Sequence, residues 1–74
     1  MKVIWEAEDI VPGKKYSKPN IEVWMIGYVF EEEGGKKFVS ISLSDGLVTK
    51  PEMASVLAET LTVAGYLPME LIHT

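Results

Sequence analysis

The residues of this 74-residue chain that could do chemistry are one histidine, a few serines and eleven acids. His73 is the side chain whose ordinary titration falls nearest to neutral pH. A hydrolase-like arrangement would combine His73 with Asp45 and with Ser42 or Ser44. The sequence around these serines lacks the sharp strand-to-helix turn that exposes a nucleophilic serine. We therefore expect no catalytic residue and no enzyme activity, and we interpret His73 as a solvated residue.

The acids fall into two groups, Glu6 to Asp9 and the run Glu31 to Glu33. A site for a divalent ion needs ligands from several elements or a loop with regular ligand spacing, and neither group provides it. The second group precedes Gly34 and Gly35, where it can pair with following lysines across a turn. No phosphate-binding motif surrounds these glycines, and the chain has no cysteine. We expect neither a metal nor another cofactor.

Aromatic and lysine residues offer one alternative function. Proteins that bind single-stranded nucleic acid combine stacking aromatic rings with a basic groove. The residues that could do so here are Lys14, Lys15, Tyr16, Lys18, Trp24 and Tyr28. Against this reading, the chain has a net charge of −4 and all seven basic residues are lysines, so the bidentate fork of arginine is absent. An acidic inhibitor of a nucleic-acid-binding protein is a further alternative.

A predicted β-hairpin over residues 21–43 organises the chain. Two runs of β-branched and aromatic residues flank an acidic, glycine-containing turn. If Gly34 and Gly35 are the central turn residues, Phe30 opposes Val39, Tyr28 opposes Ile41 and Ile26 opposes Leu43. One face is then almost wholly apolar and forms the core, with Trp24, Ile26, Tyr28, Phe30, Val39, Ile41 and Leu43. A three-residue turn would instead place Val39, Ile41 and Leu43 on the same face as Val23.

A helix is predicted over residues 50–64. Thr49 and Glu52 have the spacing of a capping box, and Gly65 is the expected C-terminal stop. Residues 2–7 alternate as a short strand would, and residues 69–72 could form a last short strand. The prediction is one α+β domain over residues 1–74, in which one helix packs on a twisted antiparallel sheet of three to four strands built on the hairpin.

Two surfaces remain without an expected partner in this arrangement. The second sheet face is half apolar, and the outer helix face carries small residues in place of the usual charges. Their residues are the interface candidates Val23, Met25, Val29, Phe38, Ala54, Ser55, Ala58 and Thr62. These surfaces favour a non-enzymatic binding or assembly module that contacts another copy of itself or another protein.

The sequence also indicates where such a module would act. The N-terminal apolar segment is too short for a signal peptide, and no apolar run approaches membrane-spanning length. We expect a soluble, cytoplasmic protein with no membrane partner, and the acidity argues against nucleic acid as the partner.

Overall fold

The computed structural model describes residues 3–18, 22–33 and 35–72, and His73 and Gly34 lie outside these ranges. The chain forms a curled sheet of five antiparallel strands in the order β4-β3-β2-β1-β5, together with one main helix. This confirms the predicted α+β fold, with a strand count slightly above the predicted three to four. In chain order the elements are η1 (Ala7–Asp9, a 3-10 turn), β1 (Lys15–Ser17), β2 (Trp24–Glu32), β3 (Gly35–Ser42), β4 (Glu52–Met53), α1 (Ala54–Ala64), β5 (Leu67–Pro68) and α2 (Met69–Ile72).

The central hairpin of β2 and β3 is confirmed, but its turn lies one residue earlier than predicted. Glu32 pairs with Gly35, so residues 33–34 make the connection. Gly35 has a φ of +127°, which L-residues rarely adopt. The second glycine therefore opens β3 and does not belong to the turn itself.

A β-bulge sets the register below the turn. The pairing shifts between Tyr28 and Phe30, which leaves Val29 as one extra residue on β2. Ile26 consequently pairs with Ser40, and Tyr28 pairs with Phe38. The predicted pairs, Phe30 with Val39, Tyr28 with Ile41 and Ile26 with Leu43, are therefore wrong.

The new register redistributes the apolar side chains between the two faces of the sheet. The inner face, which packs against α1, carries Trp24, Ile26, Phe38, Ser40 and Ser42. The outer face carries Val23, Met25, Val39, Ile41, Leu43 and Val48. The predicted core face is thus split, since Trp24 and Ile26 point inward while Val39, Ile41 and Leu43 point outward. This grouping matches the one expected from a longer turn, although the bulge produces it.

Helix α1 begins later than predicted and ends where predicted. Thr49 does not cap the helix, because its Oγ1 accepts a hydrogen bond from the Ser40 backbone N–H at 2.8 Å. Glu52 belongs to β4, where it pairs with Phe38 of β3, so helical structure starts only at Ala54. At the other end Gly65 adopts the left-handed conformation with a φ of 82°, which terminates the helix.

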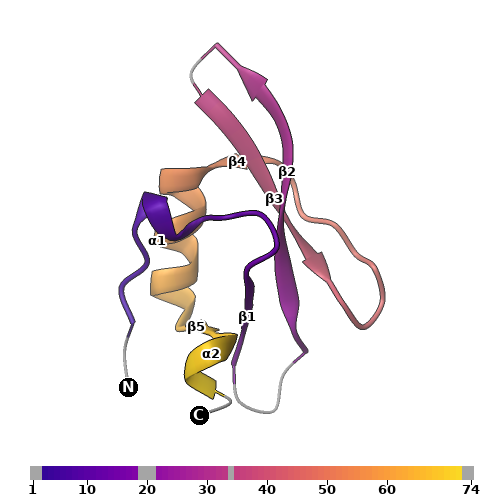
Figure 1. Ribbon diagram of the computed structural model, residues 1–74, viewed down its shortest axis with the longest axis vertical. Coiled ribbons are helices and arrows are strands. Elements are labelled where there is room, and N and C mark those ends of the chain that lie inside the picture. The colour runs from indigo at the N-terminus through magenta and orange to yellow at the C-terminus, as the bar shows by residue number, and fades with distance from the viewer. Residues whose placement is uncertain (1–2, 19–21, 34, 73–74) are drawn as a thin grey trace.

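The core lies between α1 and the inner sheet face (Figure 1). Its buried residues come from both ends of the chain as well as from the hairpin: Trp5, Ile10, Tyr16, Ile26, Phe38, Leu57, Ala58 and Leu61. The predicted strand over residues 2–7 is wrong, because residues 3–6 form no strand and η1 follows them. Trp5, just before the 3-10 turn η1, packs into the core beside α1.

The C-terminal prediction is also wrong in detail. A strand is present at β5, two residues before the predicted segment, and residues 69–72 form the short helix α2. Strand β5 pairs with β1 through Tyr16 with Pro68 and Ser17 with Leu67. The edge of the sheet is therefore closed by the segment that follows α1.

Candidate functional site

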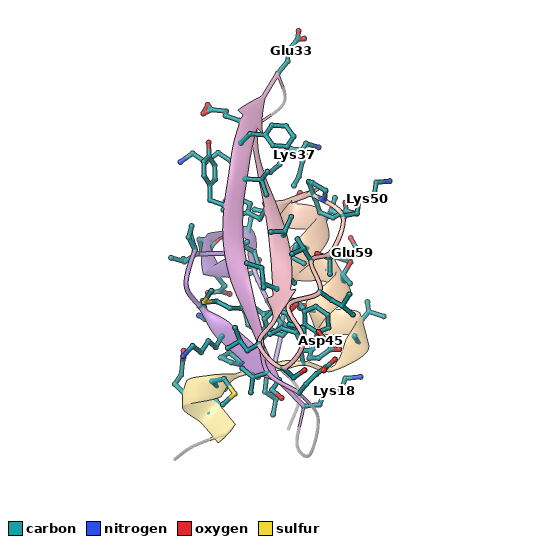
Figure 2. The ribbon with its side chains drawn as sticks, turned by 90° about the vertical axis from the view of Figure 1, so that its right-hand side faces the viewer. Lys18, Glu33, Lys37, Asp45, Lys50 and Glu59 are labelled. Carbon is teal, nitrogen blue, oxygen red and sulfur yellow. The ribbon has the colours of Figure 1, made fainter. Side chains whose placement is uncertain are left out.

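The outer face of the sheet is an apolar surface that α1 leaves uncovered. Figure 2 views β2 and β3 with α1 behind them, so the helix protects only the inner face. On the outer face Leu43 is 48% exposed and Val48 is 60% exposed. Ile41 and Val48 are joined by an isolated β-bridge, so the chain that follows the turn around Asp45 extends this face beyond β3.

Gly27 determines how closely the outer-face side chains pack. A Cβ atom at Gly27 would lie 3.1 Å from Ile41 Cδ1 and 3.5 Å from Val39 Cγ2. The missing side chain lets these two residues lean over the strand, and Val39 is only 6% exposed as a result. The face is therefore a packed apolar surface with its own small cluster, separate from the core around α1.

The outer face contains residues that the sequence did not single out as interface candidates. The sequence pattern predicts Ile41 and Leu43 in the core, and Val48 is not among the predicted interface candidates. Leu47, beside Val48, is 62% exposed and donates its backbone N–H to Asp45 Oδ1 at 3.1 Å. The apolar pair after the Asp45-Gly46 turn was a usable signal, because such a pair on a turn needs a partner surface.

The predicted interface candidates do not gather on one surface. Val23 and Met25 lie half-buried on the outer face, whereas Val29 is at the bulge and 42% exposed. Phe38 is 6% exposed and Ala58 is 3% exposed, so both belong to the core and neither can contact a partner. Of the remaining helix residues, Ala54 packs against the core, Ser55 is exposed and Thr62 is half-buried.

The small-residue face of α1 is covered by the chain itself. The Trp5 backbone N–H donates to Thr62 Oγ1 at 2.8 Å, and η1 packs along the same helix face. Small side chains at Ala58 and Thr62 allow this close approach. The N-terminal segment therefore occupies part of the helix face on which a contact with another copy was expected.

The serines considered for nucleophilic chemistry form a hydrogen-bonded cluster with Glu22. Ser44 Oγ donates to Glu22 Oε2 at 2.6 Å, and Ser42 Oγ donates to the same oxygen at 3.3 Å. Asp45 bonds the Leu47 backbone and does not join them. The carboxylate accepts both hydroxyl protons where β3 ends, so the arrangement holds the loop in place.

The six residues of the nucleic-acid alternative do not form an exposed stacking surface, because Tyr16 and Trp24 pair between β1 and β2 on the inner face. Tyr16 is 4% exposed, and Trp24 is half-buried and packs against the core. Tyr28 is 47% exposed and makes an edge contact with Phe38 at 5.8 Å between ring centroids.

The lysines of that set contact the chain's own side chains. Lys14 Nζ lies 3.7 Å from Glu70 Oε1 and 5.5 Å from the Trp5 ring centroid. Lys18 Nζ lies 4.8 Å from the Tyr66 ring centroid, while Lys15 is exposed. Rings and ammonium groups thus do not line one accessible groove.

The N-terminal acids serve the local fold. Asp9 Oδ2 accepts a hydrogen bond from the Glu6 backbone N–H at 2.8 Å, which closes the turn of η1. In the part of the chain that the structure describes, no three His, Asp or Glu side chains converge so that they could hold a metal ion.

Tyr16 is the buried titratable group of the core. Burial raises the pKa of its hydroxyl above the ordinary value of 10.0, the hydrogen bond to Ser40 opposes this shift, and Tyr66 adds to it. The folded state therefore holds the Tyr16 proton more tightly than the unfolded state. This contribution to stability is present below pH 10 and is lost as the pH rises through the folded-state pKa.

Tyr16→Phe should consequently flatten the alkaline loss of stability. At neutral pH the variant should be less stable by about 0.5–1.5 kcal/mol, since one buried hydrogen bond is lost. Urea unfolding at several pH values between about 9 and 11.5 would measure the difference. The matched control Tyr28→Phe removes an exposed hydroxyl and should reproduce the wild-type profile; parallel profiles for Tyr16→Phe and wild type would contradict the assignment.

Comparisons of this chain with protein-family models, with curated proteins and with solved structures found no match. Across residues 3–18, 22–33 and 35–72, no helix has the length and apolar character that crossing a bilayer requires.

Proposed function

We propose that this chain is a small, non-enzymatic assembly module that forms a homodimer through the outer face of its sheet. The observation that supports the proposal is the row of apolar side chains on that face, with Leu43 and Val48 about half exposed or more, which no described helix covers. A surface of this kind on a soluble domain usually marks an interface. A cytoplasmic location, expected from the sequence, is part of the proposal.

The charge pattern favours a second copy of the chain as the partner that binds the outer face. Each copy has a net charge of −4, so an interface between copies must keep the acids apart. The pairing places charged residues on the outer face only toward its ends, with Lys15 toward one end and Lys37 and the position of Glu32 near the hairpin tip. An uncharged centre can therefore meet its own copy about a twofold axis without bringing like charges together.

The size of the face sets the expected affinity. The molecule measures 38 × 26 × 18 Å, and the outer face is one of its narrower sides (Figure 2). A dimer on this face would bury less than the roughly 800 Å² per partner of a standard stable interface. We therefore expect a dissociation constant in the micromolar range, with dimers prevailing only at high concentration.

Light scattering across a dilution series tests the proposal. The wild-type chain should change from dimer to monomer on dilution, whereas Met25→Glu should remain a folded monomer, with dimerisation weakened by about 100-fold. The cause is a carboxylate that would be buried without a partner. Leu43→Glu is a second variant of the same kind, for the case that Met25→Glu fails to fold.

The control adds the same charge elsewhere. Val63 is 81% exposed on α1, away from the sheet, so Val63→Glu should dimerise as the wild-type chain does. A wild-type chain that stays monomeric at millimolar concentration would exclude the homodimer. A dimer that Met25→Glu and Leu43→Glu leave intact would exclude this face.

A further inference from the structure

A pocket of about 290 Å³ lies between α1 and the inner sheet face, apart from the outer face. Three aromatic residues, Tyr16, Trp24 and Tyr66, line it together with Leu57 and Leu61 of α1. Its polar lining consists of Ser40, Thr49, Lys50, Glu52 and Thr60. An apolar pocket of this size with a few polar groups suits a molecule with one aromatic ring.

The buried end of the pocket offers a hydroxyl donor. Tyr16 donates its hydroxyl to Ser40 Oγ, and the two residues are 4% and 1% exposed. The pair has two hydroxyl hydrogens and uses one of them between its members. Among the described residues no acceptor contacts the other hydrogen, so the pair can donate one hydrogen bond to an oxygen of a bound molecule.

The mouth of the pocket carries one positive and one negative side chain. Lys50 is exposed and Glu52 is half-buried, and neither forms an ion pair with a described residue. Lys50 precedes Pro51, which favours an extended backbone and directs side chains two residues apart to the same side. Figure 2 shows Lys50 beside the start of α1.

The segment that carries these charges is fixed to the sheet. Thr49 donates its backbone N–H to Ser40 O at 2.9 Å, and Thr49 Oγ1 accepts from the Ser40 backbone N–H at 2.8 Å. Lys50 is the next residue, so its position relative to the buried hydroxyl pair is defined. The charged mouth and the hydroxyl end thus belong to one site.

We propose that this pocket binds a free aromatic α-amino acid whose ring bears an oxygen, as in L-tyrosine. The ring packs between Trp24 and Tyr66, and its phenol oxygen accepts the hydrogen bond from the Tyr16–Ser40 pair. The carboxylate binds Lys50 and the ammonium group binds Glu52. A zwitterion satisfies both charges at the mouth, which an acid or an amine alone does not.

Titrations followed by ¹H–¹⁵N NMR test this inference with four probes: L-tyrosine, L-phenylalanine, tyramine and 3-(4-hydroxyphenyl)propionate. L-tyrosine should shift the amide signals of residues around the pocket. Tyramine lacks the carboxylate and the propionate lacks the ammonium group, so each should bind about tenfold more weakly. L-phenylalanine should also bind more weakly, because it leaves the buried hydroxyl donor unpaired.

Two variants assign the charges by crossed effects. Lys50→Met should weaken L-tyrosine binding about tenfold and leave tyramine binding unchanged. Glu52→Gln should weaken L-tyrosine binding and leave binding of the propionate unchanged. The control Lys36→Met removes a lysine from the hairpin tip and should have no effect.

Three results would overturn the inference. The absence of amide shifts at millimolar L-tyrosine would show that the pocket does not bind this amino acid. Propionate binding as tight as that of L-tyrosine would exclude a zwitterion as the preferred ligand. An equal loss of tyramine binding in Lys50→Met would show that Lys50 supports the fold and does not bind a carboxylate. Met25→Glu should keep L-tyrosine binding, so failure of the dimer proposal and failure of this one are distinguishable.

Discussion

Trp5→Ala should destabilise the folded chain by about 3–5 kcal/mol, the cost of removing a large buried aromatic side chain. Trp5 is 4% exposed and makes an edge contact with Tyr16, with ring centroids 5.9 Å apart and an interplanar angle of 74°. Its indole Nε1–H donates to the Tyr66 carbonyl oxygen at 2.9 Å. One side chain therefore joins the N-terminal segment, β1 and the chain after α1. In a domain of this size such a loss approaches the whole free energy of unfolding.

Urea unfolding followed by far-UV circular dichroism would measure this effect. The neighbouring variant Ile4→Ala is the matched control, because Ile4 is 67% exposed and should change stability by less than about 0.5 kcal/mol. Trp5→Phe keeps most of the apolar contact and loses the indole hydrogen bond, so it should fall between the two. A loss below about 1 kcal/mol for Trp5→Ala would mean that the N-terminal segment does not contribute to the core.

Ile26→Ala should cost about 2–5 kcal/mol, whereas Leu43→Ala should cost less than about 1 kcal/mol. The difference arises because the bulge sets a register in which Ile26 lies on the inner face of the sheet and Leu43 on the outer face. Ile26 is fully buried, at 0% exposure, and packs in the cluster around α1. Leu43 is 48% exposed on the outer face.

This pair of variants tests the strand register directly. In the register without a bulge, Ile26 and Leu43 face each other in the core, and both substitutions would then be costly. Unfolding should be measured at low micromolar protein concentration, where the proposed dimer dissociates and Leu43 has no partner. Equal losses for the two variants would contradict the register that the structure shows.

Local signals in the sequence were sufficient to predict the hairpin and the end of the helix. β-Branched and aromatic runs on each side of a glycine turn specify two paired strands whatever their partners. Gly65 ends α1 because its left-handed backbone is accessible to glycine at little cost. The predicted start of α1 was wrong. Thr49 has the spacing of a helix cap, but its Oγ1 accepts a hydrogen bond from Ser40 that only the folded sheet provides.

The candidate surface was predicted only in part. Val23 and Met25 were correctly grouped on the second sheet face, because residues two apart on one strand share a face. Their neighbours from β3 were misassigned, since the bulge at Val29 shifts the pairing and nothing in the local sequence marks it. Phe38 and Val39 consequently exchanged faces, with Phe38 in the core around α1 and Val39 on the outer face.

The class of fold, the hairpin and the residue at which the helix ends were predictable from the amino-acid pattern, since each depends on contacts between near neighbours. Only the tertiary structure decided which apolar face is buried, that the N-terminal segment covers α1, and that Tyr16, Ser40, Lys50 and Glu52 line one pocket. The physical reason is that these features depend on pairing and packing between segments far apart in the chain. The register between β2 and β3 further depends on a single extra residue at the bulge, and no local preference encodes its position.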